Sequence, residues 1–352
     1  MKPRVLVVGG GTGGHLFGAI ALCDILVDNW DVMLATDERC RRYLPTLPYQ
    51  STVLDIPYPC LRHALGSLVA FFKIAYFMIN QRPKVVIVSG SYVCLFFAIW
   101  SVFIRAKLIV YEQNAVFGKA NTFFSYFAEK IFLGFEGTKR LPKVSEEKFV
   151  VTGNPARIAI TTPPNRLPPQ DTIHILITAG SQGSLFFDNT IPHVLVLLAQ
   201  KLPNVKICVH QQIRTHNQAL EDLYKAYDID ATLLPFFTDM TYEYTWAHLL
   251  ISRAGASTIA EIIASQLPAI LIPYRHAAYD HQTCNANALV SNKAAWMLQE
   301  DEATQDAFAS RLHKIATDPN LYTKTVSNLM RLRCNNREII LDAISKVVDN
   351  RF

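Results

Sequence analysis

The chain has 352 residues, of which 50% are hydrophobic and 18% charged, and its formal net charge is +5 at pH 7. This composition excludes a disordered chain and a coiled coil, and the length suits two domains of about 150–170 residues. The positive excess is mild and is not gathered in a tail, which argues against a dedicated nucleic-acid binder. The seven cysteines are scattered and form no C-x-x-C pair, so we expect reduced thiols and no structural zinc.

The predicted strands of the first half are short apolar runs rich in Val and Ile. Continuous runs, in contrast to alternating ones, are typical of strands buried on both faces of a parallel sheet flanked by helices. The first run is too short for the apolar core of a signal peptide, so we interpret it as a strand. The runs are Arg4–Val8, Val32–Thr36, Val85–Ser89, Leu108–Tyr111, Ile131–Leu133 and Phe149–Thr152.

Two segments of the first half, Ala64–Ile79 and Cys94–Ile104, are unusually apolar. Neither reaches the roughly 20 residues that cross a bilayer, so both are predicted to be helices of the first domain. For Ala64–Ile79 two interpretations stay open: a buried helix, or a helix lying on an anionic membrane surface. The second rests on dense aromatic residues with basic neighbours, which are Phe71, Phe72, Tyr76 and Phe77 with Arg62, Lys73, Arg82 and Lys84.

A proline-rich segment, residues 160–171, divides the chain. Its four prolines exclude the interior of a helix or of a central strand, so we expect an interdomain linker. The strand pattern then starts again. The predicted strands of the second half are Ile173–Thr178, Val205–His210, Ala231–Leu234, Leu249–Ser252 and Ala269–Pro273.

The fold class that follows is α/β, with two doubly wound, Rossmann-like halves. We expect an N-terminal domain over residues 1–159, the linker, and a C-terminal domain over residues 172–335. A last helix is predicted within residues 336–352, and it could pack on either half.

The first candidate site is the glycine loop Gly9–His15, which follows the first strand and opens a helix. Glycines let a backbone approach a ligand closely, and a helix N-terminus attracts phosphate. The loop also fits the dinucleotide pattern G-x-G-x-x-G, with Asp37 ending the second strand where a ribose-binding acid could stand. His15 is a candidate general base or a donor to a phosphate or sugar; the alternative is a histidine satisfied by backbone groups.

Three polar loops follow strands of the second half. Thr178–Ser184 is a glycine turn whose N–H groups and Ser181 suit a diphosphate. Ser252–Glu261 passes through small residues into a helix, and Glu261 can accept both hydroxyls of a ribose. The third loop is Asp280–Asn285. Because the carboxyl ends of parallel strands share one edge of a sheet, we expect these loops to form one ligand site.

Six motifs occur in an order and at distances that resemble the MurG family of bacterial glycosyltransferases. The likeness spans essentially the whole chain. It implies the GT-B fold, in which two Rossmann-like domains flank a cleft, and a C-terminal helix that returns to the N-terminal domain. The motifs are GGGTGGH (9–15), YEQNAVFGKAN (111–121), GNPAR (153–157), AGSQGS (179–184), RAGASTIAE (253–261) and DHQTCNA (280–286).

The resemblance also implies an activity. It is the inverting transfer of N-acetylglucosamine from UDP-N-acetylglucosamine to the muramoyl 4-hydroxyl of undecaprenyl-diphospho-muramoyl-pentapeptide, which turns lipid I into lipid II in peptidoglycan synthesis. The implied partners are this donor, the lipid-linked acceptor and an anionic membrane surface, without nucleic acid. The implied location is peripheral, on the cytoplasmic face of the bacterial inner membrane.

Residue by residue, the resemblance assigns the donor mainly to the second domain. Phe237 would meet the uracil through its backbone, and Glu261 would hold the ribose. Arg157 would reach the diphosphate, and His281 and Gln282 the sugar hydroxyls. The full donor set is Thr12, Gly13, Gly14, Asn114, Arg157, Ser181, Gln182, Phe237, Ala256, Ser257, Thr258, Glu261, His281 and Gln282.

The first domain would bind the acceptor and supply the catalytic base. Gly11, Gly90 and Ser91 would face the acceptor's diphosphate. For the base, His15 and Glu112 both stay open, since Glu112 could instead orient its own loop. Backbone N–H groups and helix dipoles would stabilise the departing diphosphate.

The chain departs from the family pattern at a few positions. Residues 88–92 read V-S-G-S-Y where the family usually has G-F-G-G-Y, so two glycines are lost. Gly18 and Phe117 replace usual prolines, and AGSQGS stands for GGSQGA. All the polar residues assigned above are retained, which favours a divergent but active enzyme.

No metal or other cofactor is expected. The Asp-x-Asp pattern at 228–230 is typical of a solvated helix-to-strand turn, and no His/Cys cluster has zinc spacing. Three alternatives stay open. A nicotinamide-dependent oxidoreductase would use the first glycine loop but leave the second-half loops idle. The others are another UDP-sugar transferase or epimerase of the same fold, and a non-catalytic donor-binding or membrane scaffold.

Overall fold

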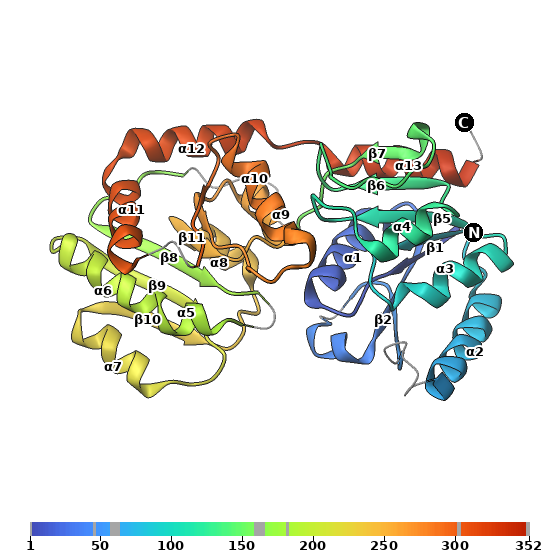
Figure 1. The fold of residues 1–352 in the computed structure, drawn as a ribbon, viewed down its shortest axis with the longest axis horizontal. Helices are drawn as coiled ribbons and strands as arrows, with labels where there is room; N and C mark the ends of the chain where they lie inside the picture. Colours follow the sequence, from blue (N-terminus) through green and yellow to red (C-terminus); the bar gives the residue numbers. More distant parts are fainter. Residues whose placement is uncertain are drawn as a thin grey trace. The chain divides into compact units, whose positions relative to one another are not determined.

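The computed structural model describes residues 2–44, 47–56, 64–157, 166–180, 183–300 and 304–349. The chain divides into two compact units, each built on its own sheet (Figure 1). Unit 1 comprises Met1–Arg157 and Cys334–Phe352, and unit 2 comprises Ile158–Arg333.

In the described part of unit 1, seven parallel strands lie in the order β3-β2-β1-β4-β5-β6-β7. The sheet grows outward from β1 in one direction and from β4 in the other, which is the doubly wound topology. The strands are β1 (Arg4–Val8), β2 (Asp31–Asp37), β3 (Gln50–Leu54), β4 (Val85–Val88), β5 (Lys107–Glu112), β6 (Lys130–Leu133) and β7 (Phe149–Val151).

Helices cover both faces of this sheet and explain why its central strands β1 and β4 are mainly apolar. Val5 and Val7 of β1 enter one core, which α1 and α13 complete. Leu6 and Val8 point the other way, into a core shared with α2, α3 and α4. The helices of unit 1 are α1 (Gly13–Leu26), α2 (Ala64–Gln81), α3 (Cys94–Phe103), α4 (Lys119–Ser125) and α13 (Asn336–Asp349).

Unit 2 repeats the topology with six parallel strands among its described residues, in the order β10-β9-β8-β11-β12-β13. The strands are β8 (Thr172–Thr178), β9 (Lys206–Gln212), β10 (Ile229–Leu234), β11 (Leu249–Ser252), β12 (Ala269–Leu271) and β13 (Trp296–Met297). The helices are α5 (Leu185–Asn189), α6 (Ile191–Lys201), α7 (Gln218–Ala226), α8 (Met240–Trp246), α9 (Ala256–Ser265), α10 (His281–Val290), α11 (Gln305–Thr317) and α12 (Pro319–Arg331).

The predicted fold class, two doubly wound α/β halves, is confirmed, and every predicted strand is present within one or two residues of its expected bounds. The edge strands β3 and β13 were not predicted, because β3 is half-exposed and mixed in polarity and β13 has two residues. Of the segment expected as a linker, residues 160–165 lie outside the described residues. Arg166, the first described residue of that segment, donates to the carbonyl oxygen of Ser265 at 3.1 Å, which anchors it to unit 2.

Candidate functional site

The two glycine loops of unit 1 meet at the switch point of its sheet. β1 and β4 are neighbours, and their carboxyl ends carry Gly9–Gly14 and Gly90–Ser91. Gly11 has φ +83°, and a Cβ there would lie 2.4 Å from the hydroxyl oxygen of Ser91. The loops therefore touch, and only glycine fits at position 11. Open α/β sheets bind ligands at this point.

The second loop is held in left-handed backbone geometry. Gly90 has φ +91° and Ser91 has φ +74°. For a residue with a side chain this region costs about 1–2 kcal/mol relative to ordinary backbone. The serine at a usual glycine position thus keeps the turn but strains it. Its hydroxyl oxygen accepts the N–H of Val93 at 3.4 Å.

His15 lies in the first turn of α1 and is half-buried. Its ring faces the second loop: a Cβ on Gly90 would lie 3.4 Å from Cε1 of His15 and 3.4 Å from Nδ2 of Asn121. The start of α1, the Gly90 turn and Asn121 therefore converge. Thr12, the N-cap of α1, makes no side-chain capping bond, and Gly13 and Gly14 follow it at the helix start.

Glu112 ends β5 and organises the loop that follows. Its carboxylate is buried; Oε1 accepts the backbone N–H of Asn114 at 2.9 Å, and Oε2 accepts Gly118 N–H at 2.9 Å and Nδ2 of Asn121 at 2.8 Å. Burial raises the pKa of Glu112, although these hydrogen bonds to the charged form oppose the rise. Asn114 also donates from its side chain to Glu112, at 3.3 Å.

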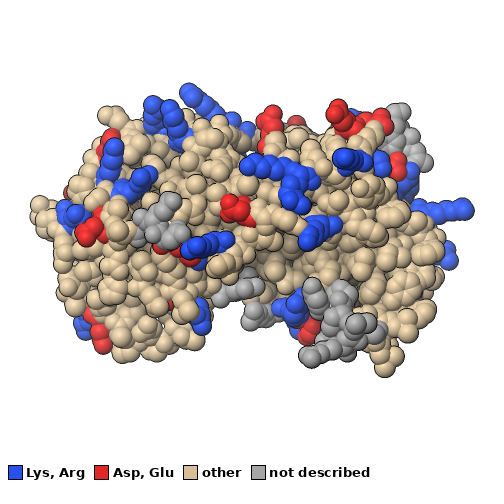
Figure 2. Space-filling model, viewed as in Figure 1, with Lys and Arg blue, Asp and Glu red and all other residues tan. Residues whose placement is uncertain are grey.

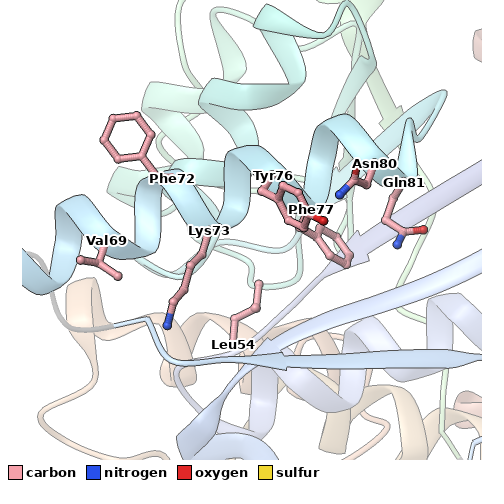
Figure 3. A pocket seen from close by; sticks show the side chains of 8 residues that line it. All are labelled: Leu54, Val69, Phe72, Lys73, Tyr76, Phe77, Asn80 and Gln81. Carbon is pink, nitrogen blue, oxygen red and sulfur yellow. The ribbon is translucent and has the colours of Figure 1, made fainter.

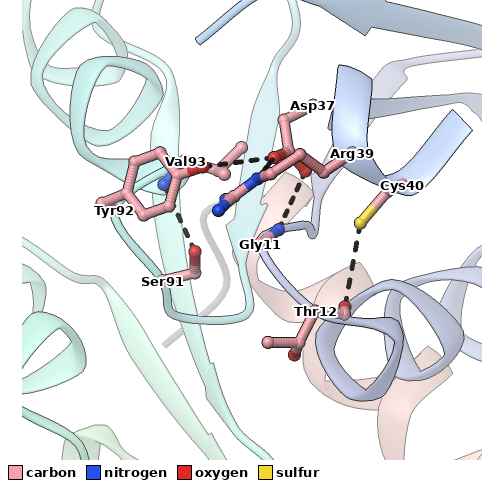
Figure 4. A network of polar contacts seen from close by, with 8 residues as sticks. All are labelled: Gly11, Thr12, Asp37, Arg39, Cys40, Ser91, Tyr92 and Val93. Atoms are coloured by element: carbon pink, nitrogen blue, oxygen red, sulfur yellow. Dashed lines mark hydrogen bonds and ion pairs between the residues drawn. The ribbon is translucent and has the colours of Figure 1, made fainter. Parts of the chain in front are cut away.

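Asp37 is buried and bonded within unit 1. Its Oδ1 accepts the N–H of Gly11 at 2.9 Å, and its Oδ2 accepts from Nε of Arg39 at 2.8 Å and the hydroxyl of Tyr92 at 3.2 Å (Figure 4). Both carboxylate oxygens are engaged. Asp37 is therefore not arranged to receive ribose hydroxyls, which removes the main support for a dinucleotide site.

Arg157 ends the first of the two chain segments that form unit 1. Its guanidinium lies over the ring of Phe17 in α1, with Cζ 4.2 Å from the ring centroid. This cation–π contact holds the side chain against the helix whose first turn carries His15. The expected role of Arg157 at the donor diphosphate stays a prediction.

The switch point of unit 2 lies between β8 and β11. Their ends are joined by a hydrogen bond of 2.8 Å between the hydroxyl oxygens of Thr178 and Ser252. The glycine turn after β8 has positive φ at Gly180 and Gly183, as a tight turn requires. Ser181 and Gln182, between them, lie outside the described residues.

α9 begins at the other side of this switch point. Gly255 is its N-cap, and Ala256, Ser257 and Thr258 form its first turn, at the carboxyl end of β11. Glu261, one turn further, is buried, and its Oε2 accepts the hydroxyl of Tyr244 at 2.8 Å. The helix N-terminus favours an anion, and Tyr244 fixes the orientation of the carboxylate.

Arg253 is a buried hub between three segments around this site. Its guanidinium donates to the carbonyl oxygens of Ile272 and Pro273 at 3.1 and 3.2 Å, to the hydroxyl of Ser184 at 2.7 Å, and to Glu300. It therefore connects the glycine turn after β8 to the end of β12.

Phe237, in the loop after β10, is 4% exposed and ends a column of stacked rings. The ring of His210 is 5.9 Å from that of Phe237 and 3.6 Å from that of Trp246, nearly parallel to both. Nδ1 of His210 lies 2.6 Å from a carboxylate oxygen of Glu243. The column fixes the backbone of the loop that was expected to contact uracil.

The third loop of unit 2 opens α10. Nδ1 of His281 lies 2.9 Å from the carbonyl oxygen of Ala278, and Oε1 of Gln282 accepts the N–H of Tyr274 at 2.9 Å. Asn285 is fully buried and donates to the carbonyl oxygen of Ala254 at 3.1 Å, which joins this loop to the start of α9.

The described residues contain no group of three or more His, Cys, Asp or Glu side chains placed to hold a metal ion. Asp228 and Asp230 lie at the amino end of β10, away from the strand ends that carry the loops above. Among the helices described, none is both long enough and apolar enough to cross a membrane.

α2 exposes an apolar face to solvent. Phe71 packs inward on Trp100 of α3, whereas Phe72 and Tyr76 are 61% and 73% exposed. We define the apolar face as Leu65, Leu68, Phe72 and Tyr76 of α2 with Phe103 of α3, all more than half exposed. Figure 2 shows little charge over these two helices.

A groove of about 640 Å³ runs between α2 and the edge strand β3. Figure 3 shows Leu54 of β3 facing the side chains of α2 across it. The other lining residues are Val69, Phe72, Lys73, Tyr76, Phe77, Asn80 and Gln81. Apolar side chains dominate the groove, and Lys73 places one positive charge in it.

Several residues that shape these sites were not predicted from the sequence. Arg253, Tyr244 and Asn121 act through contacts with other elements, and Arg39 and Tyr92 reach Asp37 from different segments. Asn121 and Arg253 do stand inside two of the quoted motifs, which is the one signal that could have identified them.

Comparison with known proteins agrees with this geometry. The models of the N-terminal and C-terminal domains of glycosyltransferase family 28 match residues 5–133 and 174–335. The UDP-N-acetylglucosamine–N-acetylmuramyl-(pentapeptide) pyrophosphoryl-undecaprenol N-acetylglucosamine transferase of Rickettsia bellii is 32% identical over 98% of this chain and 99% of its own. MurG of Acinetobacter baumannii superposes with a TM-score of 0.74 at 25% identity, over 98% of this chain and all of the other. Arabidopsis thaliana UGT89C1, at 11% identity and a TM-score of 0.69 over 99% of this chain and all of the other, shares the fold alone. The chain therefore belongs to the MurG family of UDP-N-acetylglucosamine-dependent N-acetylglucosaminyltransferases, within glycosyltransferase family 28, and has its GT-B fold.

Proposed function

We propose that the chain transfers N-acetylglucosamine from UDP-N-acetylglucosamine to the muramoyl 4-hydroxyl of undecaprenyl-diphospho-muramoyl-pentapeptide, forming lipid II from lipid I in peptidoglycan synthesis. The observation that carries this function is the full-length match to relatives whose names specify that donor and that acceptor. The retained loops at both switch points support it, since each supplies groups that a diphosphate or a sugar requires.

The donor binds to unit 2. The uracil meets the backbone at Phe237, which the stacked rings below it hold rigid. Glu261, oriented by Tyr244, accepts the ribose hydroxyls. The diphosphate lies at the N-terminus of α9, by Ala256, Ser257 and Thr258. The assignment of Ser181, Gln182 and Arg157 to the same diphosphate rests on the family resemblance alone. His281 and Gln282 contact the sugar, and the family resemblance assigns Asn114 to the same sugar.

The acceptor hydroxyl is activated in unit 1. His15 takes its proton as the oxygen attacks the anomeric carbon, because imidazoles serve as general bases near neutral pH. The new C–O bond forms on the face opposite the departing diphosphate, so the configuration inverts, and UDP leaves with the bonding electron pair. We assign Thr12, Gly13 and Gly14 to donor binding, and Gly11, Gly90 and Ser91 to acceptor binding.

Glu112 acts as a positioning residue. Its carboxylate already accepts hydrogen bonds from four donors of the 112–121 segment, so we assign the base to His15 and not to Glu112. Asn121, held by Glu112, faces the same Gly90 turn as His15. Glu112 therefore fixes the loop that borders the reacting groups.

The apolar face docks on the membrane that carries the acceptor. Isolated exposed apolar residues are ordinary, but a row of them at helical spacing on one helix, with Lys73 beside it, suits the boundary of an anionic lipid surface. The protein is thus peripheral, on the cytoplasmic side of the bacterial inner membrane where a nucleotide sugar is available.

A transfer assay tests this function. The purified chain is incubated with labelled UDP-N-acetylglucosamine and a lipid-linked muramoyl pentapeptide, with UDP-glucose as the control donor and with a chelator in a parallel sample. We expect label in the lipid product from the first donor alone, with or without the chelator. Label transferred equally from UDP-glucose, or none with either donor, would contradict the proposal.

A further inference from the structure

Arg39, beside the first glycine loop, has no part in the reaction described above. It lies in the 3-10 helix Glu38–Tyr43 (η1), which follows β2, and its side chain is 55% exposed. Figure 4 shows its guanidinium extended between the ring of Tyr92 and the backbone at Gly11. An arginine of this exposure on a short helix would ordinarily be mobile, so its fixed orientation calls for a reason.

Two contacts hold the guanidinium in place. Its Nε donates to Asp37 at 2.8 Å, and its Cζ lies 4.9 Å from the ring centroid of Tyr92. Tyr92 donates to the same carboxylate oxygen at 3.2 Å, so the three side chains form a closed cluster. Within the described residues, no contact engages the two terminal nitrogens of Arg39. These nitrogens form the edge that binds oxyanions in a bidentate manner.

That edge borders the first glycine loop. A Cβ on Gly11 would lie 3.7 Å from Nη2 of Arg39, and 2.4 Å from the hydroxyl oxygen of Ser91. The guanidinium of Arg39, the N-terminus of α1 and the Gly90–Ser91 turn therefore surround one region. The carboxylate of Asp37 forms an ion pair with Nε of Arg39 and accepts the N–H of Gly11. Its negative charge is therefore compensated and does not occupy the edge formed by the two terminal nitrogens of Arg39.

We propose that Arg39 binds the diphosphate of the lipid-linked acceptor through its two terminal nitrogens, with Asp37 and Tyr92 as its positioning residues. This inference rests on the proposed function, because that function makes a lipid diphosphate the ligand of unit 1. Arg41, in the same short helix, offers the contrast. Its Nε and Nη2 donate to Glu38 at 2.6 and 2.9 Å, so one of its two terminal nitrogens is already engaged in a bidentate pair.

Kinetics with both substrates varied, and with the acceptor in neutral detergent micelles, test the assignment. Arg39→Gln should raise the KM for the acceptor about 10- to 100-fold, the value of a hydrogen-bonded charge, and leave the KM for UDP-N-acetylglucosamine unchanged. The KM of Arg39→Lys for the acceptor should lie between those of the wild type and Arg39→Gln, because lysine keeps the positive charge but lacks the two terminal nitrogens that bind in a bidentate manner. The matched control is Arg41→Gln, which removes the same charge from the same helix and should change neither KM. A rise in the donor KM, or a loss confined to kcat, would overturn the proposal.

A binding titration that needs no turnover completes the test. Farnesyl diphosphate, titrated calorimetrically in neutral detergent, should bind the wild type and Arg41→Gln about tenfold or more tightly than Arg39→Gln. Equal affinities, or no binding to the wild type, would overturn the inference. Binding of Arg39→Gln to lipid vesicles is measured in parallel. If this variant loses affinity only for phosphatidylglycerol vesicles, and not for phosphatidylcholine vesicles or farnesyl diphosphate, the guanidinium binds membrane headgroups and the inference is overturned. If the wild type transfers no sugar but the titration depends on Arg39, the proposed function fails and the diphosphate site stands.

Discussion

The two units repeat one topology and differ in what surrounds their glycine turns. Each has such a turn after the first strand of its sheet, at the switch point. In unit 1 an exposed arginine, Arg39, borders the turn and presents a cationic edge. In unit 2 the arginine beside the turn, Arg253, is buried and bonded to carbonyl oxygens, Ser184 and Glu300. We therefore expect the same backbone turn to serve different ligands in the two units, because its neighbours differ.

The two units also differ in how their exposed apolar side chains are distributed. Unit 1 gathers exposed aromatic and aliphatic side chains on the apolar face of α2 and α3. In the described part of unit 2 the large exposed apolar residues are distributed over separate loops and helices. We expect unit 1 to meet the lipid phase and unit 2 to meet a water-soluble nucleotide.

The largest effect is expected from a substitution that disrupts the loop around Glu112 in unit 1. In Glu112→Gln an NH₂ group replaces one carboxylate oxygen and faces N–H donors, so a buried charged hydrogen-bond network is left unsatisfied. We expect a loss of about 2–3 kcal/mol in the free energy of unfolding and at least a tenfold drop in kcat. Urea unfolding and the transfer assay measure the two. Exposed Glu136→Gln is the control, and wild-type values in Glu112→Gln would refute the positioning role.

The next effect sharpens the assignment of the donor to unit 2. Glu261→Ala removes the proposed acceptor of the ribose hydroxyls, so the Kd for UDP-N-acetylglucosamine should rise about 10- to 100-fold, as for a hydrogen bond to a charged group. Calorimetric titration measures it. Tyr244→Phe removes only the orienting hydroxyl and should have a smaller effect of the same sign. Unchanged affinity in Glu261→Ala would eliminate the ribose role.

The apolar face is tested by making it polar. Phe72→Ser with Tyr76→Ser should weaken binding to phosphatidylglycerol vesicles by at least about tenfold, because each aromatic side chain contributes roughly 1.5–3 kcal/mol when fully buried. Vesicle sedimentation measures the partition. Met330→Ser, at a similarly exposed position of unit 2, is the matched control. Equal losses in both would show that the contact is not specific to unit 1.

Unit 2 also carries an acid-sensitive group. This group is His248, whose Nδ1 accepts the backbone N–H of His174 at 3.0 Å. The pKa of His248 is lowered from 6.5 to about 4, mainly by burial and further by the nearby charges of His174 and Arg166. Between these values the unfolded chain binds a proton that the folded chain does not, so stability falls as the pH drops from 6.5 toward 4. In His248→Asn the amide oxygen can replace Nδ1 without titrating. Thermal unfolding from pH 7 to 4.5 should show a shallower decline in this variant, and an unchanged slope would contradict the prediction.

The smallest effect concerns the strained turn of unit 1. Ser91→Gly should add up to about 1 kcal/mol to the free energy of unfolding, because glycine adopts φ +74° without the side-chain clash. The weak hydrogen bond from Val93 is lost in exchange. Urea unfolding measures the change, and a clear destabilisation would mean that the hydroxyl contact outweighs the strain.

Sequence patterns predicted the parts of the molecule that local physics determines. Apolar runs such as Val5–Val8 mark strands covered on both faces, and the glycines after β1 and β8 mark turns that no other residue adopts as readily. The clusters that tune each site were not predictable in the same way. Arg253 meets Ser184 across 69 residues, and Tyr92 meets Asp37 across 55, so their contacts depend on strand order and not on any local pattern.

One measurement tests the division of labour between the units most directly. The full chain, as wild type, Glu261→Ala and Arg39→Gln, is titrated calorimetrically with UDP-N-acetylglucosamine and, separately, with farnesyl diphosphate. We predict that Glu261→Ala loses affinity for the nucleotide sugar alone and that Arg39→Gln loses affinity for the lipid diphosphate alone. The reverse pattern, or a loss of both ligands in either variant, would contradict the assignment of donor to unit 2 and acceptor to unit 1.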